Sequence, residues 1–147
     1  MGALADAALA EGGRVIGVIP QFMYDIEWGH PQLTELRIVE DMHQRKRAMI
    51  DEVDAVVALP GGSGTLEELF EAISLKRLGL FGGAIVMVDT LGFYTECAKL
   101  LEDCIERRFM DERHRAMWTI VAEPEQVLDA IRAATPWPHR NRSFAAV

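Results

Sequence analysis

A glycine-rich segment near the middle of the sequence has the composition of an anion-binding loop. Residues 59–68 read LPGGSGTLEE, with three glycines between an apolar run and an acidic segment of helical character. Glycines let the backbone turn sharply enough to aim consecutive N–H groups at one point. A helix beginning at Leu66, with Thr65 as its N-cap, would add unpaired N–H groups and the positive end of its dipole. The segment therefore predicts a phosphate site, and the alternative is a tight strand-to-helix turn that binds nothing.

This segment differs from two widespread phosphate loops. No Gly-Lys-Ser/Thr follows it, so it is not a Walker loop, and Glu67 stands where the dinucleotide fingerprint would place its third glycine. Glu68 is the candidate acidic group beside it, although Thr65-x-x-Glu68 is also the spacing of a capping box, the role that spacing alone favours. A functional Glu68 would face outward near the anion site, where it could orient water or stabilise positive charge on a sugar.

A second group of charged residues lies in the segment 41–53, DMHQRKRAMIDEV. At helical spacing Arg45 and Lys46 flank the apolar stripe, whereas Arg47 points away from it and His43 receives no role. A cation on an inward face needs a carboxylate or an anionic ligand to offset its desolvation, and the alternative is a long side chain that snorkels along the core edge. The apolar stripe comprises Met42, Met49, Ile50 and Val53.

The elements that must position these residues predict an α/β fold. Short β-branched runs alternate with segments of helical period, which indicates a Rossmann-like open parallel sheet with helices on both faces. Residues 21–33 are expected to form a loop at the carboxyl end of a strand, where sites tend to form. The expected strands are 14–20, 34–40, 54–60, 84–89 and 118–122, and the expected helices are 1–13, 41–53, 65–78, 92–108 and 124–134.

Composition limits the class of protein. The 147 residues, half of them hydrophobic, predict one domain over residues 1–134 and a disordered tail over 135–147, and the mixed-charge run 106–115 is expected to be a solvated helix end. A net charge of −8 argues against binding DNA or RNA. Cys97 and Cys104, two turns apart on one helix face, are expected to be reduced. With neither a membrane span nor a secretion signal, the sequence predicts a soluble cytoplasmic protein.

The two charged segments together resemble a known family. DMHQRK followed by PGGSGTLEE is similar to the Lonely Guy (LOG) family, the cytokinin riboside 5′-monophosphate phosphoribohydrolases, which are often mislabelled lysine decarboxylases. The pattern PGGxGTxxE is filled completely by residues 60–68, and the similarity extends from residue 1 to about residue 132. Lysine decarboxylation itself is not expected, because nothing in the sequence resembles a pyridoxal-phosphate lysine site.

The resemblance implies hydrolysis of the N-glycosidic bond of a nucleoside 5′-monophosphate, giving free base and ribose 5-phosphate. AMP or N6-prenylated AMP, as in cytokinin biosynthesis, would be the substrate, and neither a metal nor an organic cofactor is implied. Arg45 and Glu68 would be the catalytic pair. The family assembles its sites at a homodimer interface, so a dimer or a larger assembly is expected. The substrate and its phosphate would be bound by Glu27, Lys46, Gly61, Gly62, Ser63, Gly64, Thr65 and Ser74, the last replacing a threonine of many relatives.

One departure from the family concerns the beginning of the sequence. Relatives carry one more βα unit, ending in a glycine-rich turn, before the position that Met1 and Gly2 match. The fold is therefore expected to lack its first βα unit, and the nucleotide pocket one of its walls. Two alternatives to the hydrolase stay open: a non-catalytic nucleotide or molybdenum-cofactor carrier of the same fold, and, because of this departure, an inactive truncated product.

Overall fold

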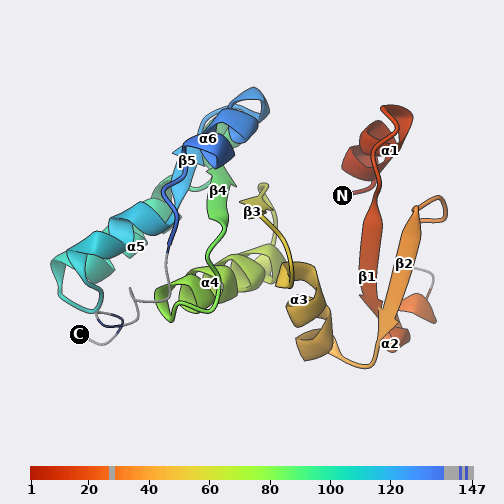
Figure 1. Cartoon of the computed structure of the whole chain (residues 1–147), viewed down its shortest axis with the longest axis horizontal. Coiled ribbons are helices and arrows are strands. Elements are labelled where there is room, and N and C mark those ends of the chain that lie inside the picture. Colours follow the sequence, from red (N-terminus) through yellow and green to blue (C-terminus); the bar gives the residue numbers. More distant parts are fainter. Residues whose placement is uncertain (27–28, 138–142, 144, 146–147) are drawn as a thin grey trace. The chain divides into compact units, whose positions relative to one another are not determined.

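The computed structural model describes residues 1–26, 29–137, 143 and 145 and confirms the α/β class. Helices alternate with strands, and the strand pairs of the described residues are all parallel, in the Rossmann-like manner (Figure 1). The chain divides into two compact units, Met1–Asp51 and Glu52–Val147, each of which is described by itself. The single domain expected over residues 1–134 therefore stays a prediction.

The first unit is built on a two-stranded parallel sheet. β1 pairs with β2 from Ile16 opposite Glu35 to Pro20 opposite Val39, and α3 packs against both strands. The loop predicted over residues 21–33 is wrong at its beginning, because its first residues form one helical turn. That turn is closed by the Asp25 backbone N–H, which donates to the Gln21 carbonyl. The elements are α1 (Gly2–Ala10), β1 (Ile16–Pro20), α2 (Gln21–Tyr24), β2 (Glu35–Val39) and α3 (Met42–Ile50).

The second unit is built on a three-stranded parallel sheet in the order β3-β4-β5. The central strand, β4, is buried along its whole length, as its uninterrupted apolar sequence requires. The elements are β3 (Ala55–Ala58), α4 (Ser63–Arg77), β4 (Ala84–Val88), η1 (Thr90–Gly92), α5 (Thr95–Glu106), η2 (Glu112–Met117), β5 (Thr119–Val121), η3 (Pro124–Gln126) and α6 (Val127–Ala133).

Apolar side chains from strands and helices form the core of the second unit. Val86, Val88 and Val121 are buried together, and α6 packs against them. Helix α4 contributes buried apolar residues to this core. The free cysteines Cys97 and Cys104 both lie on α5, the helix expected to carry them. The side chains that pack on the valine cluster are Leu59, Val127, Ala130 and Ile131, and the buried apolar residues of α4 are Leu69, Ala72 and Ile73.

The expectation of a solvated helix end over residues 106–115 holds for residues 106–109, which are exposed, and is wrong beyond them. Helix α5 ends at Glu106, and the chain then turns back so that Met110 and His114 are buried. Asp111 caps η2, and the His114 ring accepts the Asp111 backbone N–H at 3.0 Å. In the segment expected to be disordered, Trp137 and Ala145 are buried. Among the described residues, no helix has the length and apolarity that crossing a membrane requires.

Candidate functional site

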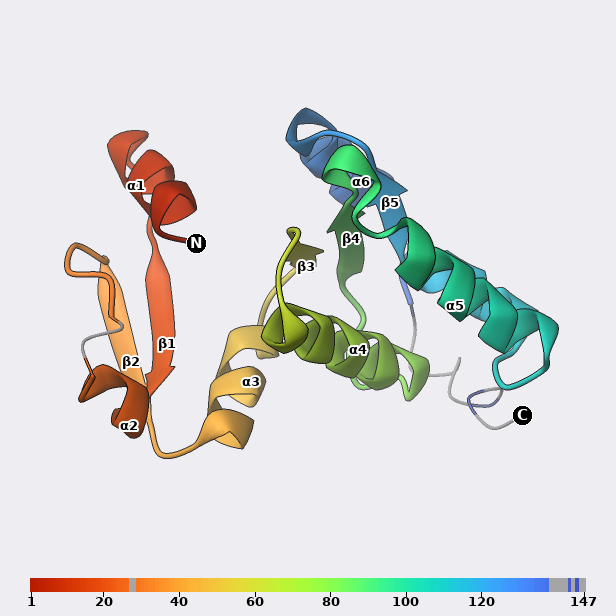
Figure 2. The same cartoon turned by 180° about the vertical axis from the view of Figure 1, so that it is seen from behind.

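The glycine-rich segment joins the carboxyl end of β3 to the start of α4 (Figure 2). Helix α4 begins at Ser63, so the predicted start at Leu66 with Thr65 as N-cap is wrong. The extended backbone of Gly62 (φ −82°, ψ −162°) makes it the N-cap, and its carbonyl accepts the Leu66 N–H at 3.2 Å. Among the described residues, no side-chain cap hydrogen bond is found at the start of this helix, and its first turn holds no acidic residue. Its first N–H groups are therefore suited to an anion.

The glycines of this loop meet different surroundings. A Cβ on Gly61 would lie 2.2 Å from Thr65 Oγ1 and 2.8 Å from Thr65 Cβ, so only glycine fits there. A Cβ on Gly62 or Gly64 would meet nothing within 4 Å. The loop thus packs tightly against Thr65 at one position and leaves open space at the other two, beside the first turn of α4.

Glu68 is half-buried on the second turn of α4, and its neighbour Glu67 is exposed. The capping box predicted from Thr65-x-x-Glu68 is not formed, because the N-cap is Gly62, which has no side chain to complete it. Ser74 lies ~14 Å further along the helix than Thr65. Its hydroxyl donates to the Phe70 carbonyl at 2.7 Å, a bond within the helix.

The predicted cations lie on α3, in the first unit. Arg45 and Lys46 are half-buried and Arg47 is exposed, as the helical spacing predicted. Arg45 Nε donates to the Val18 carbonyl of β1 at 3.3 Å. Asp41 caps the helix by accepting the Gln44 N–H at 2.8 Å. Because these cations belong to one unit and the loop with Glu68 to the other, their meeting in one site stays a prediction. Glu27 lies outside the described residues.

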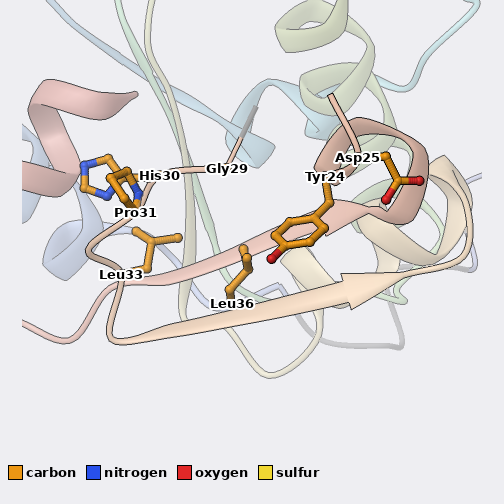
Figure 3. Close-up of a pocket in the computed structure, with 7 residues that line it drawn as sticks. All are labelled: Tyr24, Asp25, Gly29, His30, Pro31, Leu33 and Leu36. Atoms are coloured by element: carbon orange, nitrogen blue, oxygen red, sulfur yellow. The ribbon is translucent and has the colours of Figure 1, made fainter. Parts of the chain in front are cut away.

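A cavity of about 550 Å³ lies within the first unit. Figure 3 shows Tyr24 and Asp25 toward one end of it, His30 and Pro31 toward the other, and Leu33 and Leu36 between them. The His30 ring lies 3.0 Å from an Asp6 carboxylate oxygen and accepts the Gln32 N–H, which fixes the segment before β2. The cavity therefore belongs to the segment 21–33, where the sequence predicted a site, and its lining residues do not include the glycine loop.

Besides His114, two further buried polar side chains of the second unit were not predicted from the sequence. Tyr94 is fully buried, and its hydroxyl donates to the Leu59 carbonyl at 2.7 Å, directly before the glycine loop. Burial, with a smaller effect from Cys97, raises the pKa of Tyr94. Lys76 is also buried, and its Nζ donates to the Gly83 carbonyl at 2.6 Å. Burial lowers the pKa of Lys76 to about 8.

The candidate site offers a helix end whose N–H groups are suited to an anion and a carboxylate one turn away. Within the described part of the chain, no group of three or more His, Cys, Asp or Glu side chains is placed to hold a metal ion.

The signal for Tyr94 was present in the sequence only as an aromatic residue after a buried strand. Its contact with Leu59 joins residues 35 positions apart, which no local pattern predicts.

Comparison with known proteins adds a family match. A family model described as "possible lysine decarboxylase" matches residues 1–131. A cytokinin riboside 5′-monophosphate phosphoribohydrolase of Rhodococcoides fascians is 40% identical over 134 residues, which cover 90% of this chain and 68% of that protein.

Plant proteins match over a similar stretch. LOG3 of Arabidopsis thaliana, a cytokinin riboside 5′-monophosphate phosphoribohydrolase, is 38% identical over 82% of this chain and 56% of its own length. LOGL6 of Oryza sativa subsp. japonica, a probable enzyme of the same name, is 34% identical over 92% of this chain and 54% of its own length. The chain thus spans little more than half the length of these plant relatives.

Proposed function

This chain belongs to the LOG family, and we propose that it hydrolyses the N-glycosidic bond of a nucleoside 5′-monophosphate. The observation that carries the proposal is the first turn of α4, which has no side-chain cap at Gly62 and has open space beside Gly62 and Gly64, with Glu68 on the next turn. The names of the relatives supply the reaction class. AMP and N6-prenylated AMP are the candidate substrates, and ribose 5-phosphate and the free base are the products.

The proposed binding mode starts from the phosphate. The backbone N–H groups of residues 61–65 and the positive end of α4 hold the 5′-phosphate, and Lys46 lies close to it. Arg45 orients the Glu68 carboxylate or holds the nucleotide. By resemblance to the family, Glu27 and Ser74 contact the substrate. On the same ground, two or more copies of the chain assemble.

The proposed reaction breaks the bond between C1′ of the ribose and the base nitrogen and forms a bond from C1′ to water oxygen. One proton of that water replaces the ribose on the base nitrogen, and the other stays on the oxygen as the anomeric hydroxyl of ribose 5-phosphate. The transition state carries positive charge shared between C1′ and the ring oxygen. The Glu68 carboxylate stabilises that charge and positions the water, which is the role of a preorganised electrostatic group.

The test measures the release of free base from AMP and from isopentenyladenosine 5′-monophosphate, with chromatography as the readout. Glu68→Gln keeps the shape of the side chain and removes its charge, and we expect the rate to fall by about 10²-fold or more. Glu67→Gln is the matched control, because Glu67 is the exposed neighbour on the same helix, and it should keep the rate of the unmodified chain.

The outcomes separate the alternatives. Full release by Glu68→Gln would refute the role of the carboxylate. Tight AMP binding without release by the unmodified chain would favour the carrier, and absence of both would favour an inactive product. The ratio of the two release rates identifies the preferred base. Light scattering on the protein as it elutes from a size-exclusion column gives the number of copies in the assembly.

A further inference from the structure

The carbonyl that immediately precedes the glycine loop has a dedicated buried partner. The β3–β4 pairing ends at Ala58 opposite Met87, so Leu59 lies beyond the last strand pair. A carbonyl at such a position needs a partner once it is removed from water. The Tyr94 hydroxyl supplies it at 2.7 Å, and the Tyr94 residue is 0% exposed.

Tyr94 is itself held at both ends. Its backbone N–H donates to the Asp89 carboxylate, and the Asp89 N–H donates to the Val121 carbonyl at 2.7 Å. The Tyr94 ring packs edge-on against Phe93, with ring centroids 5.0 Å apart. These bonds tie together the segments that follow β3 and β4 and the last residue of β5, at the carboxyl edge of the sheet where open α/β folds bind ligands. Tyr94 therefore has little freedom to move away from Leu59.

The bond from Tyr94 determines the direction of the loop. The Leu59 carbonyl belongs to the planar peptide that ends at the Pro60 nitrogen, so fixing this oxygen fixes the plane. Proline then locks its own φ near −65°. A single backbone torsion, ψ of Pro60, remains between that fixed plane and the N–H of Gly61, the first N–H of the loop.

We propose that Tyr94 is a positioning residue for phosphate binding: through the Leu59 carbonyl it sets the direction of the N–H groups in the Gly61–Thr65 loop. The proposal rests on the proposed function, because it requires that this loop bind the phosphate of the substrate. Tyr94 contacts the Leu59 carbonyl, which precedes the loop, and does not touch the substrate. Its effect should therefore be confined to ligands that carry a phosphate.

The test is the affinity of the full chain for ribose 5-phosphate and for adenosine, measured by calorimetry with Tyr94→Phe beside the unmodified chain. The substitution removes one oxygen atom and keeps the buried ring. We expect about 5- to 10-fold weaker binding of ribose 5-phosphate, the range of one lost hydrogen bond. Adenosine affinity should stay the same. In turnover of AMP, KM should rise by a similar factor while kcat changes less.

Lys76→Met is the matched control, because Lys76 is another buried side chain that donates to a carbonyl, at the opposite end of β4. It should change the melting temperature and leave the ribose 5-phosphate affinity unchanged. Asp89→Ala removes the acceptor of the Tyr94 N–H and should weaken the same ligand, whereas Asp89→Asn keeps an acceptor oxygen and should bind nearly as the unmodified chain. If Tyr94→Phe does not fold, this Asp89 pair decides the question.

Two results would overturn the inference in distinguishable ways. If the unmodified chain binds ribose 5-phosphate and Tyr94→Phe binds it equally well, while only its melting temperature falls, then Tyr94 is structural and the proposed function stands. If the unmodified chain binds no phosphate-bearing ligand at all, the proposed function fails, and the positioning role fails with it.

Discussion

Replacing Gly61 by alanine should distort the phosphate loop, and the cost can be worked from two distances. The new Cβ would lie 2.2 Å from Thr65 Oγ1 and 2.8 Å from Thr65 Cβ, whereas nonbonded carbon atoms rest at roughly 3.5–4.0 Å. Rotating the threonine side chain moves Oγ1 but leaves its Cβ in place, so the backbone of the loop must shift. Overpacking of this kind destabilises a protein by about 1–3 kcal/mol.

The same shift turns the loop N–H groups away from the phosphate. Loss of one hydrogen bond to a charged group costs about 1.5–3 kcal/mol, so we expect roughly 10- to 100-fold weaker binding of ribose 5-phosphate. The assays are urea unfolding for stability and calorimetry for affinity. Gly61→Ala with unchanged stability and unchanged affinity would refute the packing argument.

Gly64→Ala separates stability from binding. A Cβ at this position meets nothing within 4 Å, and alanine favours a helix over glycine by up to about 1 kcal/mol, so stability should hold or rise. If the phosphate occupies that open space, however, the added methyl group should still weaken ribose 5-phosphate binding, by about 10-fold for one lost charge-assisted bond. Undiminished affinity in this variant would show that the phosphate does not lie there.

Three further predictions follow from single side chains. Burial lowers the pKa of Lys76 from 10.5 to about 8, so between these pH values the unfolded chain binds more protons than the folded chain. The free energy of unfolding should therefore rise with pH over this window, by at most about 3 kcal/mol. Urea titrations at pH 7.5 and 9.5 measure this rise, and Lys76→Met should flatten it. Burial raises the pKa of the Cys97 thiol, so iodoacetamide at pH 8 should alkylate it slowly in the native chain and quickly in urea, as read by mass spectrometry of the peptides; equal rates would contradict this. Asp41→Ala removes the N-cap of α3 and should destabilise that helix by about 1 kcal/mol, with faster amide hydrogen exchange over residues 42–50, while Asp41→Asn should behave as the unmodified chain.

The sequence predicted the order of the elements because the periods of its apolar residues differ clearly. The run AVVA of β3 and the run AIVMV of β4 are short and β-branched, whereas the segments around Arg45 and Glu68 have helical spacing. The start of α4 was predicted three residues too late, because Thr65 has a side-chain oxygen that can cap a helix, whereas glycine has none. The extended backbone at Gly62 decides the position instead.

Contacts between distant segments could not be predicted from the sequence. His114 looked solvated among charged neighbours, but the turn after α5 buries it. Tyr94 meets Leu59 only because β3 and β4 are neighbours in register, which brings the segments after them together. Local patterns specify periods, caps and turns, whereas such contacts depend on which strands pair.

In the second unit, one helix carries both the proposed phosphate site and the proposed hydrolytic group. Thr65 and Glu68 are three residues apart on α4, so they project from one side of the helix, with Glu68 about 4.5 Å further along. A sugar held by its 5′-phosphate at the first turn would extend along this side toward the carboxylate. Binding and turnover should therefore respond to different substitutions. Gly64→Ala should raise the Kd for ribose 5-phosphate, whereas Glu68→Gln should leave that Kd nearly unchanged and abolish most base release, because the carboxylate acts on charge that exists only in the transition state.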